Sequence, residues 1–157
     1  PEDKITVLIQ RQSRIHSMVE FRDGSIKAQL SASDMRACSR YALSYPKRWD
    51  SPEAERIDWG SEPPITFNEP DMETFGCLKL ARQASRTGRT MPCAMNAANE
   101  VANAAFRRGD CGFLDIERTC AAVMEHHTIR PVESVHQLEE VDAESRAQAR
   151  EYLAERL

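Results

Sequence analysis

The stretch that decides the fold covers residues 15–30 and reads IHSMVEFRDGSIKAQL. Two runs of alternating apolar and polar residues flank Asp23-Gly24, a pair that tolerates the positive φ angles of a two-residue type I′ turn. The pattern therefore predicts a β-hairpin whose pairing is counted outward from that turn. One face would carry the pairs Phe21–Ile26, Val19–Ala28 and Ser17–Leu30, and the other Glu20–Lys27, Met18–Gln29 and His16–Ser31.

The face with Phe21 is expected to join the core, which leaves His16 on the mainly polar face. A histidine in such a position is most often a solvated or hydrogen-bonded surface residue. The alternation of the strands does not by itself make His16 catalytic, so both readings stay open on the pattern alone.

The N-terminal third is predicted to be a small β-sheet followed by a helix. Residues 5–9, ITVLI, are β-branched and continuously apolar apart from one threonine, as in a strand that is covered on both faces. Asp34 is a candidate N-cap for a helix that runs to about Tyr45 and ends at Pro46. Residues 1–46 are therefore expected to form one folded piece.

Residues 47–73 are predicted to be a linker that runs over the surface. The segment holds four of the eight prolines and shows little periodicity. Residues 65–67, ITF, are a candidate short edge strand within it.

The remaining residues, 74–157, are predicted to be a helical bundle. Expected helices run from Thr74 to Gly88, from Pro92 to Gly109, from Asp115 to His127, over a short turn at Ser134 and Gln137, and from Asp142 to Leu157. Ile116, Cys120, Val123 and Met124 form one apolar stripe, which is read as core. Asn96, Asn99 and Glu100 share one helix side, where structural anchoring is favoured over catalysis. The fold class is α+β, with the sheet and its helix joined by the Pro-rich linker to the bundle.

Composition limits the classes of partner and of location. The chain has 157 residues, of which 41% are hydrophobic and 29% charged, as is usual for globular proteins. A net charge of −4 argues against nucleic acid or an anionic membrane as partner. No apolar run approaches the ~20 residues that span a bilayer. The five cysteines contain no C-x-x-C pair and are read as free thiols of a cytoplasmic protein.

Several ordered motifs carry a resemblance to a known family. The string QSRIHSMV at 12–19 continues with DGS at 23–25, AQ at 28–29 and DMR at 34–36, and CLKLA at 77–81 and NAANEV at 96–101 follow. In order and spacing these motifs resemble 1-deoxy-D-xylulose-5-phosphate reductoisomerase, an NADPH- and divalent-metal-dependent enzyme of non-mevalonate isoprenoid biosynthesis. The resemblance covers only the C-terminal portion of that enzyme, less than half of it. The start at Pro1, without an initiator methionine, is what a processed or excised piece would show.

The resemblance implies roles for three residues. His16 would lie beside the substrate and the metal, Ser13 would support it, and Met35 would pack near the nicotinamide or the substrate. The family's Gly-rich nucleotide fold, acidic metal ligands and phosphate-binding residues belong to the N-terminal part of the enzyme, so no metal ligand is assigned here. NADPH and Mg²⁺ or Mn²⁺ are thus expected in the full enzyme, and this piece alone is expected to bind neither and to be inactive.

Two further expectations concern partners. The resemblance and the unpaired sheet edge together predict a homodimer built largely from residues 1–46, with the missing N-terminal part of the same enzyme as the other partner. The alternative from a different class is a non-catalytic oligomerisation or scaffold module.

The chain departs from the family pattern at three places. Gln10-Arg11 stands where the family usually has His-Pro, Ser33 replaces a proline, and Ala37-Cys38-Ser39 replaces an aliphatic-Pro-Ile triplet. Because proline fixes φ, its loss predicts a looser or differently shaped loop around Met35.

Overall fold

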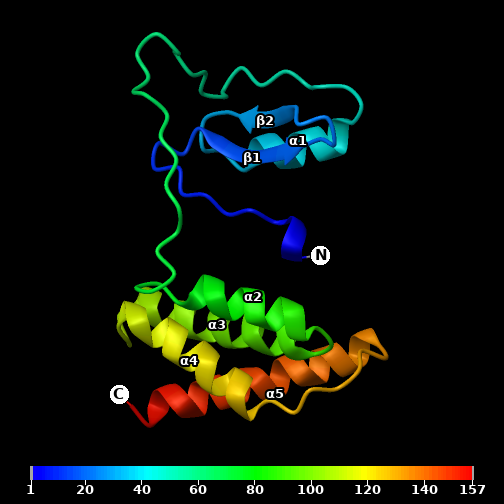
Figure 1. The fold of residues 1–157 in the computed structure, drawn as a ribbon, viewed down its shortest axis with the longest axis vertical. Coiled ribbons are helices and arrows are strands. Elements are labelled where there is room, and N and C mark those ends of the chain that lie inside the picture. Colours follow the sequence, from blue (N-terminus) through cyan, green and yellow to red (C-terminus); the bar gives the residue numbers. More distant parts are fainter. Residues whose placement is uncertain (1, 157) are drawn as a thin grey trace. The chain divides into compact units, whose positions relative to one another are not determined.

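The computed structural model describes residues 2–156, which divide into two units that are treated separately below (Figure 1). One unit comprises residues 7–70 and contains a two-stranded antiparallel sheet and one helix. The other comprises residues 2–6 and 71–156 and contains the remaining α-helices. The α+β class predicted from the sequence is confirmed.

The hairpin consists of strands β1 (Ile15–Glu20) and β2 (Ile26–Leu30). Its turn is one residue longer than predicted. The Phe21 N–H donates to the Ser25 carbonyl at 2.8 Å, and the Gly24 N–H donates to the Phe21 carbonyl at 3.0 Å. Gly24 has a φ of 80°, so a left-handed glycine completes a three-residue connection rather than a two-residue type I′ turn.

The predicted register is therefore wrong by one residue. Glu20 pairs with Ile26 and Met18 with Ala28, which exchanges the faces of β1 relative to those of β2. The Asp23 carboxylate explains the longer turn, since its Oδ1 accepts the backbone N–H of Ser25 at 2.9 Å. The predicted core face is also wrong for this unit, because all of β2 is exposed, including Ile26 at 58%.

A β-bulge changes the pairing again at His16. The register shifts between Ile15, which pairs with Leu30, and Ser17, which pairs with Gln29. His16 thus lies in the bulge and has no partner in the register, whereas pairing with Ser31 was predicted. Bulges of this kind re-aim a side chain, and here the side chain is His16.

The strand predicted over residues 5–9 is not formed. A short 3-10 helix, η1 (Glu2–Lys4), is followed by an extended segment in which Ile9 and Asn68 make an isolated antiparallel bridge. No strand of the described chain pairs along this segment, and Ile5 is 62% exposed. The edge strand predicted at 65–67 is likewise not formed, and the bridge lies at Asn68, just beyond it.

Helix α1 (Arg36–Ser44) begins close to its predicted start. The Asp34 Oδ1 accepts the Arg36 N–H at 2.9 Å, and the helix ends before Pro46. Residues 47–70 hold no helix or regular strand, and they belong to the same unit as the hairpin.

The helical unit is built around α3 (Met91–Arg108), which packs against α2 (Cys77–Thr87), α4 (Phe113–His126) and α5 (Val135–Ala154). Small side chains let these helices approach closely, and the predicted apolar stripe of α4 is confirmed as core. The main core cluster contains Ala98, Ala102, Ala105, Ile116, Cys120, Val123, Ala149 and Leu153. As predicted, Gly109 ends α3 in the left-handed region, with a φ of 82°.

The C-terminal region is one continuous helix, α5, where a short turn and a separate helix were predicted. Ser134 is its N-cap and accepts the Gln137 N–H at 3.1 Å. Asp142 is not a second cap but lies inside the helix, where its carboxylate accepts from Arg146 Nε at 2.6 Å. No glycine or proline interrupts residues 135–154, so nothing in the backbone stops the helix there.

Candidate functional site

The candidate site is the turn of chain that holds His16 at the base of the hairpin. The His16 Nε2 lies 3.1 Å from the Ser13 carbonyl oxygen, and its Nδ1 lies 3.2 Å from the Gln29 Oε1 and 3.4 Å from the Ser31 Oγ. Because a carbonyl oxygen only accepts, Nε2 can serve the Ser13 contact only as the hydrogen-bond donor, and the Gln29 Oε1 is likewise an acceptor that Nδ1 can bind only by donating. The contact at Nδ1 is exposed, so it is the nitrogen that a bound molecule could reach by displacing the Gln29 carboxamide.

Ser13 supports His16 through its backbone as well as through its position. Its carbonyl accepts from both His16 and the Ser33 Oγ, the latter at 2.8 Å, and its own Oγ lies 2.9 Å from the Ser33 Oγ. Ser13 has a φ of 53°, a conformation that costs a non-glycine residue about 1 kcal/mol or more. Such a conformation persists only where neighbouring contacts fix it.

Met35 lies two residues beyond Ser33, just before the first turn of α1. Its side chain is 79% exposed. The structure thus brings His16 and Ser13 together, whereas Met35 is connected to them only through the Ser33 segment. Where the resembling family has a proline, Ser33 supplies two hydrogen bonds to Ser13 instead.

Sequence reasoning missed a set of polar residues around this turn. The Gln10 Oε1 accepts the backbone N–H of Arg14 at 2.8 Å, and Arg14 forms a bidentate pair with Glu62. No local pattern marks the second contact, since 48 residues separate its partners in the chain. The departure at Gln10 was visible in the sequence, but its hydrogen bond was not.

The described residues do not form a metal cage. Among residues 2–156, no three His, Cys, Asp or Glu side chains converge to hold an ion. Within that span, no helix is long and apolar enough to cross a membrane. The cysteines are unpaired thiols, and burial raises the pKa of Cys120 to about 12, which suits a core residue rather than a nucleophile.

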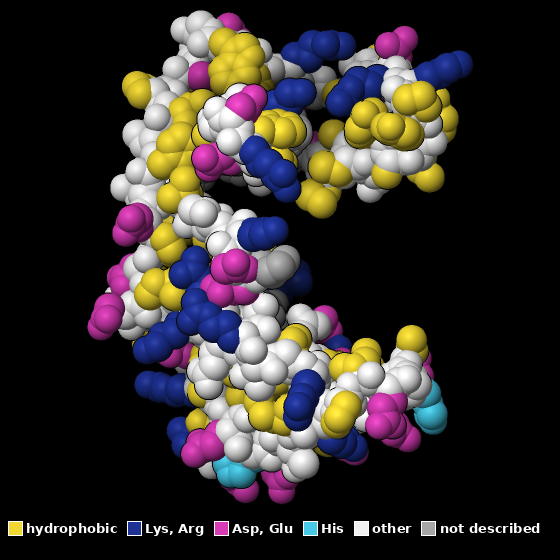
Figure 2. Space-filling model, turned by 45° about the vertical axis from the view of Figure 1, so that its right-hand side comes forward, with side chains coloured by type: hydrophobic (Ala, Val, Ile, Leu, Met, Phe, Trp, Pro, Cys, Tyr) yellow, Lys and Arg dark blue, Asp and Glu magenta, His cyan; other side chains and the backbone are white. Residues whose placement is uncertain are grey.

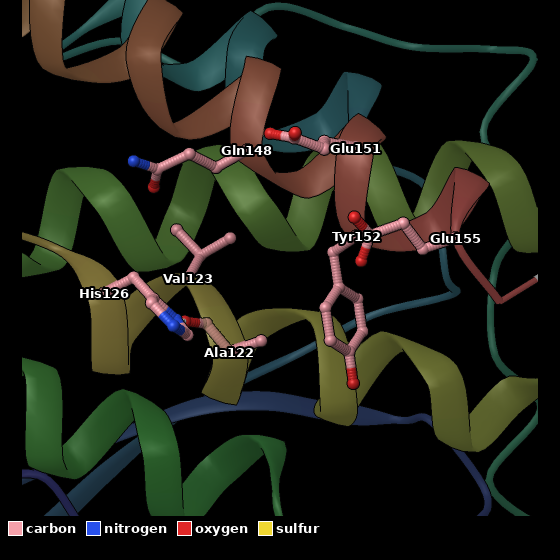
Figure 3. Close-up of a pocket in the computed structure, with 7 residues that line it drawn as sticks. All are labelled: Ala122, Val123, His126, Gln148, Glu151, Tyr152 and Glu155. Atoms are coloured by element: carbon pink, nitrogen blue, oxygen red, sulfur yellow. The ribbon is translucent and has the colours of Figure 1, made fainter.

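The helical unit has a cavity of its own, of about 310 Å³, between α4 and α5 (Figure 3). In Figure 3 the Tyr152 side chain extends from α5 toward α4, while His126 faces the cavity from α4. The His126 Nδ1 lies 2.8 Å from the Ala122 carbonyl, a favourable contact for a histidine at the C-terminal end of a helix. The cavity is lined by Ala122, Val123, His126, Gln148, Glu151, Tyr152 and Glu155.

Two of the three polar residues singled out on α3, Asn96 and Glu100, make the anchoring contacts favoured from the sequence. The Asn96 Nδ2 donates to the Glu100 Oε1 at 3.1 Å, and the Glu100 Oε2 accepts from the Arg146 Nη2 at 2.6 Å. These contacts join α3 to α5. They leave the His16 turn as the stronger candidate for chemistry.

Comparisons with known proteins show what the chain as a whole is similar to. The model of the DXP reductoisomerase C-terminal domain matches residues 30–148. The chain is 44% identical over 151 residues to 1-deoxy-D-xylulose 5-phosphate reductoisomerase of Ruminiclostridium cellulolyticum, covering 96% of this chain and 39% of that protein. The Methylobacillus flagellatus enzyme is 46% identical over 152 residues, covering 97% and 38%.

Solved structures agree as well. The reductoisomerase of Zymomonas mobilis in complex with NADPH superimposes with a TM-score of 0.87 at 40% identity, covering 98% of this chain and 40% of that one. A reductoisomerase in complex with NADPH, fosmidomycin and magnesium gives a TM-score of 0.84 at 33% identity, covering 94% and 38%. The chain thus spans about two fifths of the length of these relatives. On the agreement of motifs, domain model and fold, it belongs to the 1-deoxy-D-xylulose 5-phosphate reductoisomerase family and corresponds to its C-terminal portion.

Proposed function

We propose that this chain supplies one wall of the substrate pocket of an NADPH- and metal-dependent enzyme that converts 1-deoxy-D-xylulose 5-phosphate to 2-C-methyl-D-erythritol 4-phosphate. The observation that carries the proposal is the exposed His16, whose ring is oriented by the Ser13 carbonyl with Nδ1 toward solvent-accessible groups. An imidazole fixed in this way can accept a hydrogen bond at Nδ1 from a substrate hydroxyl, or donate one when it is protonated.

The metal and the dinucleotide belong to other parts of the proposed enzyme. NADPH and magnesium are present in the similar solved structures. The described residues do not converge into an ion site, and the sequence contains no G-x-G-x-x-G turn for a pyrophosphate. We therefore assign this chain the binding and orientation of substrate by His16, with Ser13 in support and Met35 as a flanking apolar group.

Replacement of His16 in the full-length enzyme tests the proposal. We expect His16→Ala to lower kcat/KM by about tenfold or more, the range of a lost positioning or proton-transfer group. His136→Ala is the matched control, since this histidine is on the exposed side of α5 with a side chain 81% accessible. A fall of less than about threefold for His16→Ala, or an equal fall for both variants, would return His16 to an ordinary surface role.

A second expectation concerns the chain by itself. Without the remainder of the enzyme it should neither bind NADPH nor oxidise it, because hydride transfer needs cofactor and substrate held in one productive geometry. The measurement follows nicotinamide absorbance with 1-deoxy-D-xylulose 5-phosphate and Mg²⁺ or Mn²⁺ present. Sustained turnover above the blank after repeated purification would contradict this assignment.

One observation favours an additional, non-catalytic role in association. The hairpin exposes large apolar side chains, and Figure 2 shows apolar side chains on the surface of the unit to which it belongs. They include Met18, Val19, Ile26 and Leu30. Because apolar surface and unpaired strand edges favour association, we propose a symmetric dimer formed largely by residues 1–46. Sedimentation should show a dimer at tens of micromolar, and a clean monomer there would count against it.

A further inference from the structure

We propose that Arg14 and Glu62 are positioning residues for His16, an inference that rests on the function proposed above. The Arg14 Nε donates to the Glu62 Oε2 at 2.9 Å, and its Nη2 donates to the Glu62 Oε1 at 2.6 Å. The side chains are only 22% and 15% exposed. This two-point geometry fixes direction as well as distance, which a single contact to a lysine would not do.

The connection to His16 runs through one peptide unit. The Ser13 carbonyl, which holds the His16 Nε2, and the backbone N–H of Arg14 belong to the same planar peptide. Rotation of that plane would therefore move the acceptor of His16. The Arg14 N–H is bound by the Gln10 Oε1 at 2.8 Å, so the plane is restrained from its other side.

Arg14 is also fixed by its own carbonyl, which accepts the Ser31 N–H at 3.2 Å at the end of the hairpin ladder. The pairing of the Arg14 side chain thus restrains Arg14 itself, which lies between the left-handed Ser13 and the bulge at His16. Because Ser13 has no intrinsic preference for its φ of 53°, the contacts of Arg14 help to hold that conformation.

Glu62 is presented to Arg14 by an anchored segment. The Gln12 Nε2 donates to the Pro64 carbonyl and to the Thr66 Oγ1, both at 3.0 Å. A second carboxylate, Glu55, lies 3.9 Å from the Arg14 Nη1 and is too far for the same fork. The hydrogen bond to Glu62 raises the pKa of Arg14, in keeping with a charged pair. The segment 55–66 therefore affects the orientation of His16 indirectly, through Arg14.

The pair predicts a specific failure when it is broken. Without the Glu62 charge the guanidinium is released, the peptide between Ser13 and Arg14 gains freedom, and the His16 ring samples other orientations. Binding groups elsewhere in the pocket would be unaffected, so kcat should fall more than KM rises.

The experiment compares Glu62→Gln, Arg14→Met and the charge-swapped double variant R14E/E62R in the full-length enzyme. Glu53→Gln is the matched control, because Glu53 pairs with Arg40 in the same unit and its hydrogen bonds and ion pair go to Arg40 and Ser51 rather than to residues 10–16. We expect each single variant to lower kcat by about fivefold or more, as loss of orientation does, and the swap to recover part of that loss. The ¹⁵N resonances of the His16 ring should shift in both single variants and stay unchanged in the control.

The two readouts separate this inference from the proposed function. An unshifted His16 resonance in Glu62→Gln would overturn the positioning role whatever the activity. An unchanged kcat in Glu62→Gln would also overturn the positioning role if His16→Ala is impaired. If His16→Ala itself is fully active, the proposed function fails, while the resonance still decides whether Arg14 and Glu62 orient the ring. Should Arg14→Met fail to fold, Glu62→Gln and the swap carry the test.

Discussion

The environment of His127 at the end of α4 favours the neutral form of its ring. Its Nε2 lies 2.8 Å from the Thr90 Oγ1, and that oxygen accepts the Arg130 N–H at 3.0 Å. The Thr90 hydroxyl can therefore donate a hydrogen bond to His127, whose Nε2 acts as acceptor. Burial, followed by the nearby Arg130 charge, lowers the pKa of His127, while Glu144 opposes this effect.

This arrangement predicts a pH dependence of stability. Because the folded pKa lies below the ordinary value of about 6.5, the unfolded chain binds more protons as the pH falls through that value. The stability contributed by neutral His127 is thus present above about pH 6.5 and is lost progressively below it. Urea unfolding at about pH 7.5 and about pH 5.5 should show a smaller difference for His127→Gln than for the wild type.

His136→Gln is the control for that measurement, because His136 is highly exposed on α5. It should keep the wild-type difference between the two pH values. If the two variants lose the same amount, His127 does not carry the effect.

For single residues, the sequence predicted which residues form the candidate site better than it predicted the contacts those residues make. The motif at 12–19 marks Ser13 and His16, and the structure joins them by a hydrogen bond. It could not reveal that the Ser13 backbone rather than its hydroxyl holds the ring, because that depends on a left-handed φ at a non-glycine residue. Glu62 was equally hidden, since it reaches Arg14 only after the chain folds back.

Among the elements, α3 buries mainly alanine side chains against its neighbours. Ala98 and Ala102 are fully buried where α3 packs against its neighbours. Ala102→Leu should therefore lower the free energy of unfolding by about 1–3 kcal/mol through overpacking. Ala104→Leu, on the exposed side of the same helix, should change it by less than about 0.5 kcal/mol. Equal effects in denaturant titrations would show that the core accommodates the larger side chain.

Helices and turns were predicted correctly where the residues suited only one structure. They were predicted wrongly where the same residues suited two structures. Gly88 and Gly109 end α2 and α3 as expected. Asp23-Gly24 suits both a two-residue and a three-residue turn, and the bond from Asp23 to Ser25 selects the second. Asp142 resembles an N-cap but can equally pair with Arg146 one turn later, so a single helix was read as two.

Across the whole molecule, burial is distributed unevenly between the two units. The buried residues lie almost entirely in the helical unit, whereas residues 7–70 contribute only Ala32 and Ser44. Local opening costs less where few apolar contacts are broken. Backbone amides of α3 should therefore exchange with deuterium more slowly than those of β1 and β2 in the isolated chain.

The amides of α3 and of the hairpin serve as controls for each other, because both sets are hydrogen-bonded in regular structure and are measured in one sample. Equal protection of α3 and β1 would mean that the chain opens as a single cooperative body. The expected difference would also explain why the hairpin pattern was misread as a core face, because its apolar residues have too few partners within this unit to bury them.

The chain order of the helical unit has a consequence for how the protein can be divided. Glu2 pairs with Arg82 and Arg86 of α2, so the segment before the hairpin belongs to the helices and the chain returns to them at Asp71. Within the described residues, the unit of residues 7–70 thus lies between two segments of the helical unit and is connected to them at both ends. Proteolytic cleavage at one of the two junctions between the units would leave the units covalently joined through the other junction. A shortened gene that bridges residues 6 and 71 by a linker should therefore release the helical domain as an independent module.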